Sequence, residues 1–295
     1  MKLSIGIPVL NQFDETARCL KQIHKTASNF EKIYLVDNGS TPDTISQLEE
    51  FNLDSEILNK LVVIRNEKNL GVRPALNQIW EACKEDVIVF THNDVEFFEK
   101  NWDLKVLKAF EENENAGIIG AYGAKGIGTF DIYKTPYKMH QLARNGNVSN
   151  CRMDKEVHGF RNLENEFENV AVFDGFFMAI KKELLDKTKG FSDILPSHHN
   201  YDNLICIQSL ENKYENIVIS LDLNHLGGRT DVGEDWTKEM GKTKQQIHID
   251  AHPPLWEYGK GKLPIIIEDI FNDEYKVIGY NLYMDEQLIK QKMYE

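Results

Sequence analysis

Apolar runs of strand length alternate with stretches of helical spacing along the first part of the chain. Leu3–Val9 is rich in β-branched residues and stops at a polar turn, after which residues 15–27 carry apolar side chains at helical spacing. The order repeats, with further strands predicted at 32–36, 61–64 and 87–91. Strands that alternate with helices form a parallel sheet with helices on both faces. The pattern therefore predicts an α/β fold with a mostly parallel, Rossmann-like central sheet.

Asp94 lies in a short polar cluster directly after the last of these strands. In an open α/β sheet, ligands bind outside the carboxyl ends of the strands. A carboxylate at this position, beside His92 and Asn93, can hold a hard divalent cation against the phosphates of a nucleotide. Alternatively, Asp94 caps the helix predicted at 102–110 or forms an Asx turn. The residues alone leave these interpretations open.

The pattern becomes less regular after residue 120. Residues 123–169 are rich in Gly, Asn, Lys and Arg and are expected to form a long irregular excursion, of a length that is usually functional. Regular elements return with strands at 170–173, 176–180 and 217–221 and a helix near 202–213. From about residue 229 the chain is charged and less periodic, which indicates a C-terminal extension.

Composition narrows the possible partners and the compartment. The 295 residues carry a net charge of -13, which argues against nucleic acid and anionic membranes as partners. Four cysteines, with no C-x-x-C pair, are expected to be small buried hydrophobes in a reducing compartment: Cys19, Cys83, Cys151 and Cys206. Because no signal peptide and no transmembrane segment is recognisable, we expect a soluble cytoplasmic protein.

Several motifs occur in a fixed order along the chain. They are Ile7–Asn11, Val36–Ser40, Asn69–Asn77, His92–Asp94, Phe173–Met178, Gly190–Phe191, Tyr201–Asp202 and His225–Gly228. In order and spacing they resemble family 2 glycosyltransferases with the GT-A fold. The resemblance implies a catalytic domain at 1–228, with a nucleotide-binding half at 1–96 and an acceptor-side half at 97–228, followed by an extension at 229–295.

In the nucleotide-binding half, the resemblance assigns donor binding to residues at the ends of the first strands. They are Pro8, Val9, Asn11, Asp37, Asn69, Arg73, Asn93 and Asp94. The Asp37 carboxylate can accept a hydrogen bond from a base N–H or a ribose hydroxyl. Its alternative role is to cap the next helix, which Ser40 or Thr41 can do instead. Arg73 meets either a phosphate or only solvent.

The segment His92-Asn93-Asp94 falls where the family carries its metal-binding Asp-x-Asp, so Asp94 alone remains of the acidic pair. The resemblance implies a divalent metal, Mn²⁺ or Mg²⁺, held by Asp94 and His225. Imidazole can bind Mn²⁺ but matches Mg²⁺ poorly. His92 therefore ligates the metal, hydrogen-bonds the ribose or phosphate, or does neither.

Asp202 aligns with the Asp of the family's Glu-Asp pair, which is Tyr201-Asp202 here. An inverting transfer needs one carboxylate to take the proton of the acceptor hydroxyl, and the resemblance gives this role of general base to Asp202. A position in the first turn of a helix, stabilised by the helix dipole, is compatible with that role. Asp174 and Gly175 are assigned to acceptor binding.

Taken together, the resemblance implies an inverting hexosyl- or deoxyhexosyltransferase of polysaccharide biosynthesis. It would use a nucleoside diphosphate sugar, with UDP as the default and dTDP or GDP as options, and act on a hydroxyl of a glycan or lipid-linked saccharide. Through such an acceptor it could lie peripheral to a membrane. Two alternatives remain: a catalytically silent nucleotide-sugar or glycan-binding protein, since His92 and Tyr201 replace acidic residues, and a nucleotidyltransferase.

Overall fold

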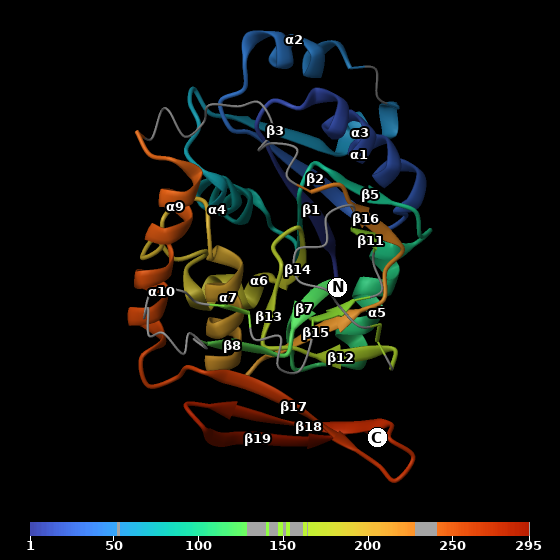
Figure 1. The fold of residues 1–295 in the computed structure, drawn as a ribbon. Coiled ribbons are helices and arrows are strands. Elements are labelled where there is room, and N and C mark those ends of the chain that lie inside the picture. Colours follow the sequence, from blue (N-terminus) through green and yellow to red (C-terminus); the bar gives the residue numbers. More distant parts are fainter. Residues whose placement is uncertain are drawn as a thin grey trace.

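A computed structural model describes residues 1–51, 54–128, 140–141, 147–149, 152–153, 162–163, 165–227 and 241–294. Its centre is an eight-stranded sheet (Figure 1). In spatial order the strands are β12 (Phe167–Asn169), β15 (Glu215–Ile219), β6 (Ala116–Gly120), β14 (Phe177–Lys181), β4 (Val87–Thr91), β1 (Leu3–Val9), β2 (Phe30–Asp37) and β3 (Leu61–Arg65).

Strand directions in this sheet confirm the predicted fold class. β4, β1, β2 and β3 are parallel neighbours, and so are β6 and β15. β14 runs antiparallel between β4 and β6, and β12 runs antiparallel along β15. The chain is therefore a mixed α/β protein whose large sheet is mostly parallel.

Helices cover both faces of the sheet, as the alternating pattern predicted. Ile88 and Phe90 of β4 belong to one hydrophobic cluster together with residues of α4, α6 and α7, whereas Val87 and Val89 belong to a second cluster with residues of α1 and α5. The helices preceding the C-terminal region are α1 (Phe13–Thr26), α2 (Pro42–Glu50), α3 (Ser55–Lys60), α4 (Val72–Ala82), α5 (Trp102–Glu112), α6 (Lys182–Thr188) and α7 (Tyr201–Glu211).

The excursion at 123–169 is not wholly irregular, which corrects the prediction from sequence for its described parts. It contains short strands that pair with partners elsewhere in the chain. One three-stranded sheet joins β10 (Asn147–Ser149), β7 (Tyr122–Ala124) and β13 (Val172–Phe173). Another joins β11 (Arg152–Met153), β16 (Leu223–His225) and β5 (Val95–Phe97). Cys151 and Gly228 lie outside the described residues.

Residues 241–294, the described part of the C-terminal region, form two helices and a three-stranded meander: α9 (Lys244–Asp250), α10 (His252–Gly259), β17 (Ile265–Phe271), β18 (Val277–Met284) and β19 (Gln287–Met293). β17 pairs with β8 (Gly126–Gly128), which in turn pairs with β9 (His140–Gln141), so the meander extends a five-stranded sheet (Figure 1). Residues of α10, β17 and β18 share a hydrophobic cluster with β4 and α7. The domain boundary at residue 228 stays a prediction.

A buried lysine ties the meander to the rest of the chain. The Lys125 ammonium lies 2.7 Å from Asp269 Oδ1 on β17 and 3.1 Å from Glu168 Oε2 on β12, and none of the three side chains is exposed by more than 7 %. A buried cation with two carboxylate partners is compensated only while both strands stay docked. The cluster therefore fixes the C-terminal sheet against the edge of the central sheet.

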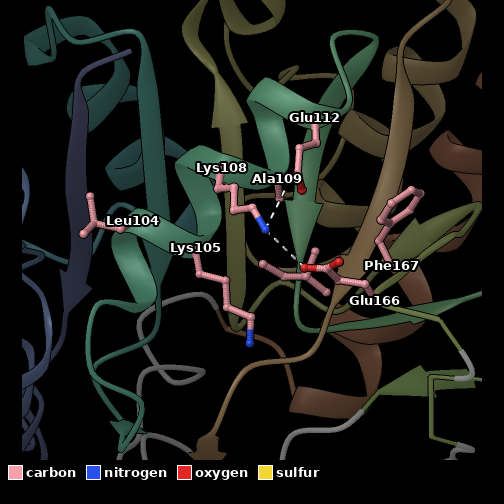
Figure 2. Close-up of a pocket in the computed structure, with 8 residues that line it drawn as sticks. Leu104, Lys105, Lys108, Ala109, Glu112, Glu166 and Phe167 are labelled. Atoms are coloured by element: carbon pink, nitrogen blue, oxygen red, sulfur yellow. Dashed lines mark ion pairs between the residues drawn. The ribbon is translucent and has the colours of Figure 1, made fainter.

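A cavity of about 410 Å³ lies between α5 and β12. Figure 2 shows Lys108 of α5 pointing toward Glu112 and Glu166, with which it forms ion pairs of 3.2 Å and 3.6 Å. None of the residues assigned to donor, metal or acceptor binding lines this cavity. Within the described residues, no helix has both the length and the apolar character needed to cross a bilayer.

Candidate metal and catalytic site

Two segments far apart in the sequence bring His225 beside Asp94. β16 pairs antiparallel with β5 so that His225 stands opposite Val95, and the Leu226 N–H donates to the Asp94 carbonyl at 3.1 Å. Asp94 itself follows the buried strand β4 and is 5 % exposed. It does not cap α5, whose N-cap is Asn101. The ladder between β5 and β16 thus places a histidine and an aspartate at one edge of the sheet.

Three side chains form a cluster that suits a divalent cation. One ligand atom each from His92, Asp94 and His225 lies within 4.8 Å of the other two. Asp94 Oδ1 is 3.4 Å from His225 Nε2 and 3.9 Å from His92 Nδ1. This oxygen is buried and accepts no hydrogen bond from the described residues. A buried carboxylate oxygen without a donor, facing two imidazole nitrogens, is a fitting ligand set for a metal ion.

Electrostatics favour the protonation states that metal binding needs. Burial lowers the pKa of His92, as does the neighbouring His225, although Asp94 and Asp174 act in the opposite direction. Burial by itself would raise the pKa of Asp94, but the adjacent His225 and His92 imidazoles hold it below its ordinary value. A neutral imidazole and an ionised carboxylate are the ligating forms of these groups. His92 and Asp94 therefore favour these forms near neutral pH.

Asp202 lies in the first turn of α7, as the sequence predicted. Both carboxylate oxygens accept backbone hydrogen bonds, Oδ2 from Gly175 N–H at 3.1 Å and Oδ1 from Asn203 N–H at 2.8 Å. Burial and the nearby Asp174 nevertheless raise the pKa of Asp202 to about 7. A carboxylate with a pKa near neutral pH is well suited to accept a proton from a hydroxyl group.

The acceptor-side residues reach the metal cluster through β14. This strand runs antiparallel to β4, and His92 N–H donates to the Phe176 carbonyl at 2.9 Å. Of the two preceding residues, Asp174 acts electrostatically on both His92 and Asp202, and Gly175 N–H donates to Asp202. Phe176 also stacks on His225, with ring centroids 4.5 Å apart and an interplanar angle of 15°. The structure thus brings together all of the residues assigned to metal, base and acceptor.

The donor-side residues meet around Asn38, which is not among the residues predicted from sequence although it lies inside the Val36–Ser40 motif. Asn38 N–H donates to the Val9 carbonyl at 2.8 Å. Its side chain donates to Asn69 Oδ1 at 2.9 Å and to the Gly71 carbonyl at 3.1 Å. Asn38 is 4 % exposed and therefore acts as an internal connector of the loops that follow β1, β2 and β3.

Asn11 also connects two loops on the donor side, the one that follows β1 and the one that follows β2. Its backbone N–H donates to Ser40 Oγ at 2.8 Å, and its side-chain oxygen accepts from Thr41 N–H at 2.7 Å. Thr41 is the N-cap of α2, so the capping role considered for Asp37 belongs to Thr41. Pro8 precedes Val9 within β1 and pairs with Val36.

Asp37 and Arg73 each keep a buried polar atom that makes no hydrogen bond with the described residues. Asp37 Oδ1 accepts from Ser40 N–H at 3.0 Å, whereas Oδ2 makes none and lies 3.9 Å from Arg65 Nε. Arg73 stands in the first turn of α4, and its Nε makes none either. Asn93 instead donates to Thr16 Oγ1 at 3.0 Å. Asp37 and Arg73 thus retain hydrogen-bonding capacity for a ligand. Asn93 anchors the segment His92–Asp94, which carries two of the candidate metal ligands, to α1.

The model of the family described as glycosyl transferase family 2 matches residues 4–189, more than half of the chain and including β1 to β14. The chain belongs to glycosyl transferase family 2. Two curated relatives in this range are an "uncharacterized glycosyltransferase YfnE" of Bacillus subtilis (strain 168) and an "uncharacterized glycosyltransferase" of Haemophilus influenzae (strain Rd). They are 28 % and 26 % identical over 207 residues, which cover 68 % and 69 % of this chain. The matched part spans only 50 % and 60 % of the relatives' own length.

Solved structures of other glycosyltransferases share the fold of this family 2 chain. A mannosyltransferase from Pyrobaculum calidifontis, in complex with GDP-Man and Mn²⁺, superposes with a TM-score of 0.53 at 15 % identity, covering 87 % of this chain and 67 % of its own. GalNAc-T7 with UDP, GalNAc and Mn²⁺ gives 0.57 at 14 % identity, covering 76 % and 43 %. At these identities the likeness establishes the GT-A fold.

Proposed function

We propose that the protein is an inverting glycosyltransferase that moves a sugar from a nucleoside diphosphate donor to a hydroxyl group of a glycan or lipid-linked saccharide. The observation that carries the proposal is that Asp202, a carboxylate with a pKa of about 7, directly follows Tyr201, whose hydroxyl contacts His92 in the cluster of His92, Asp94 and His225. A base and a cation site at one edge of the sheet are the two groups that an inverting transfer requires.

On the donor side, the proposal assigns the nucleotide to the loops joined by Asn38. Asp37, whose Oδ2 makes no hydrogen bond with the described residues, is the candidate acceptor for a hydrogen bond from the base or the ribose. Arg73, with its free Nε, is the candidate contact for a phosphate. Pro8 and Val9 form the end of β1, Asn11 and Asn69 lie in the loops, and Asn93 anchors the segment that carries His92 and Asp94. The neighbours that contain GDP-Man or UDP and GalNAc support a nucleotide-sugar donor.

On the acceptor side, Asp174 and Gly175 line the approach to Asp202. The acceptor hydroxyl oxygen attacks the anomeric carbon, its proton passes to Asp202, and the bond between that carbon and the diphosphate oxygen breaks with the electron pair on the leaving group. A metal bound by Asp94, His225 and His92 would stabilise the negative charge of that leaving group. Attack on the face opposite the diphosphate inverts the anomeric configuration.

The test is release of nucleoside diphosphate from a panel of UDP-, GDP- and dTDP-sugars, with saccharide acceptors, Mn²⁺, Mg²⁺ or chelator. We expect release from one donor, and a loss of about 10²-fold or more in Asp202→Asn, the range of general base catalysis. Product analysis should show an inverted anomeric centre. Undetectable release with every donor and acceptor, together with retained saccharide binding, would instead indicate a catalytically silent binding protein.

A further inference from the structure

The two positions at which this chain departs from its family's acidic motifs touch each other. His92 stands where the Asp-x-Asp motif begins, Tyr201 stands where the Glu-Asp pair begins, and His92 Nε2 lies 3.3 Å from Tyr201 Oη. Tyr201 is buried, being 8 % exposed, and its ring packs edge-on against Phe191 at 6.0 Å between centroids. The two replacements therefore form one hydrogen-bonded pair rather than two independent losses of a carboxylate.

The geometry of this pair determines which nitrogen of His92 can serve as a ligand. Nδ1 faces Asp94 Oδ1 at 3.9 Å, and Nε2 faces the Tyr201 hydroxyl. In a neutral imidazole one nitrogen carries the proton and the other has the lone pair. If Nε2–H donates to Tyr201 Oη, the lone pair of Nδ1 is directed toward Asp94 and His225. Hydrogen bonds of this kind fix the tautomer and ring orientation of metal-bound histidines in other proteins.

Gly175 provides the space that the tyrosine hydroxyl needs. A Cβ at position 175 would lie 2.6 Å from Tyr201 Oη, closer than carbon and oxygen atoms approach without displacement. The backbone N–H of Gly175 also holds Asp202 Oδ2. The same backbone segment therefore sets the position of the tyrosine hydroxyl and of the neighbouring carboxylate.

The second histidine of the cluster is oriented by a different contact. His225 Nδ1 is buried and makes no hydrogen bond with the described residues, and its ring stacks on Phe176. One imidazole is thus fixed by a hydrogen bond and the other by an aromatic face, and both direct a nitrogen toward Asp94. Two nitrogens and one carboxylate oxygen form a ligand set that suits Mn²⁺ and the later first-row metals, whereas Mg²⁺ prefers oxygen ligands alone.

We propose that Tyr201 is a positioning residue that holds His92 as a metal ligand through Nδ1, and that the resulting site selects a first-row transition metal over Mg²⁺. The presence of a metal rests on the proposed function. The new statements are the class of metal that the site binds and the residue that determines this preference. The proposal also gives the unusual pair His92 and Tyr201 one common role.

The test is a direct titration of the purified protein with Mn²⁺, Co²⁺ or Mg²⁺ alone. Calorimetry measures the binding of each metal, and visible absorption also measures that of Co²⁺. We expect the wild type to bind Mn²⁺ at least about 10-fold more tightly than Mg²⁺. Tyr201→Phe, which removes only the hydroxyl, should weaken Mn²⁺ binding by about 10- to 100-fold. Tyr34→Phe is the matched control, because its hydroxyl contacts Glu85 and belongs to no part of the site. Its Mn²⁺ affinity should equal that of the wild type.

Two further measurements test the proposal even if the Tyr201→Phe protein does not fold. His92→Asp, which restores an acidic residue, should reduce the preference for Mn²⁺ over Mg²⁺ by about 10-fold or more. In the metal-free wild type, long-range ¹⁵N NMR of histidine should show the His92 proton on Nε2. A proton on Nδ1, equal binding of Mn²⁺ and Mg²⁺, or an unchanged affinity in a folded Tyr201→Phe protein would overturn the proposal.

The titrations need no sugar donor, so they separate this proposal from the proposed function. Selective Mn²⁺ binding through His92 without any sugar transfer would support the proposal and contradict the function. Sugar transfer supported equally by Mg²⁺ and Mn²⁺, with no effect of Tyr201→Phe on metal affinity, would support the function and contradict the proposal.

Discussion

Replacing Asp202 with Asn is expected to change how the stability of the protein depends on pH. Burial and Asp174 raise the pKa of Asp202 from an ordinary 3.8 to about 7. The folded protein therefore holds this proton more tightly than the unfolded chain does. The resulting stabilisation is fully present below about pH 4 and is lost as the pH rises through about 7.

The magnitude follows from the two pKa values. At about 1.4 kcal/mol per pH unit, the interval corresponds to a loss of about 4 kcal/mol, of which about 3 kcal/mol falls between about pH 5 and about pH 8.5. Asn does not ionise, so Asp202→Asn should gain that amount relative to the wild type over the same range. Both oxygens of Asp202 accept backbone N–H groups, and an amide nitrogen cannot. The cost of that mismatch is the same at both pH values and cancels.

The assay is urea unfolding of both proteins at about pH 5 and about pH 8.5, compared as a double difference. Asp273→Asn, at an exposed position in the turn before β18, controls for the loss of one negative charge. A double difference below about 0.5 kcal/mol would refute the reasoning, because it would mean that Asp202 titrates alike in the folded and unfolded chain. The assignment of Asp202 as a base with a pKa near neutral pH would then lose its physical support.

Three further changes test the packing of the site and of the C-terminal meander. Gly71→Ala should destabilise the fold by about 2 kcal/mol or more, because Gly71 has a φ of +92° and a new Cβ would lie 2.4 Å from Ser197 Cβ. A free energy of unfolding in urea within about 0.5 kcal/mol of the wild-type value would contradict this. Lys125→Met should lower the free energy of unfolding by about 3–5 kcal/mol in the same assay, since it removes the cation that two buried carboxylates share. An unchanged free energy of unfolding would show that the cluster does not anchor the meander. Phe176→Leu should weaken Mn²⁺ binding several-fold in a calorimetric titration by releasing the His225 ring, and an unchanged affinity would assign the ring's orientation to other contacts.

The periodic part of the chain could be predicted from sequence because its elements are local. Strands β1 to β4 and helices α1 and α5 lie within a few residues of their predicted ranges, because strands and amphipathic helices each have a characteristic spacing of apolar residues. In α1, for example, Cys19, Leu20 and Ile23 form one buried face. The order of these elements was sufficient to predict the fold class.

The short strands β7, β8 and β10 to β12 could not be predicted, because their hydrogen bonds come from partners far along the chain. β8, with the sequence Gly-Ile-Gly, exists as a strand by pairing with β17, about 140 residues later. β17 begins with three consecutive isoleucines, a local strand signal that the predicted elements do not include, whereas β19, whose exposed side chains include Leu288 and Ile289, and the short strands named above carry no such signal. Pairing between distant segments, rather than local propensity, determines these elements.

The candidate site divides in the same way. Motif order predicted the candidate residues of the site, and the fold places His225 beside Asp94 and Gly175 beside Asp202. The contact between His92 and Tyr201 was not foreseen, because it joins the residue after β4 to the first residue of α7, and these lie 109 positions apart in the sequence. Each residue looked like an isolated departure from a motif, and only their proximity indicates a shared role.

Nucleotide binding coupled to metal binding tests the central claim most directly, since it needs neither the sugar nor the acceptor. The measurement is the dissociation constant of UDP, GDP and dTDP by calorimetry, with and without Mn²⁺, for the wild type and Asp94→Ala. We predict that Mn²⁺ tightens binding of one of these nucleotides by about 10-fold or more, within the usual range of coupling free energies, and that Asp94→Ala removes this effect. Binding of no nucleotide, or binding that is equally tight without Mn²⁺ and in Asp94→Ala, would contradict a metal-assisted nucleotide-sugar site at the end of β4.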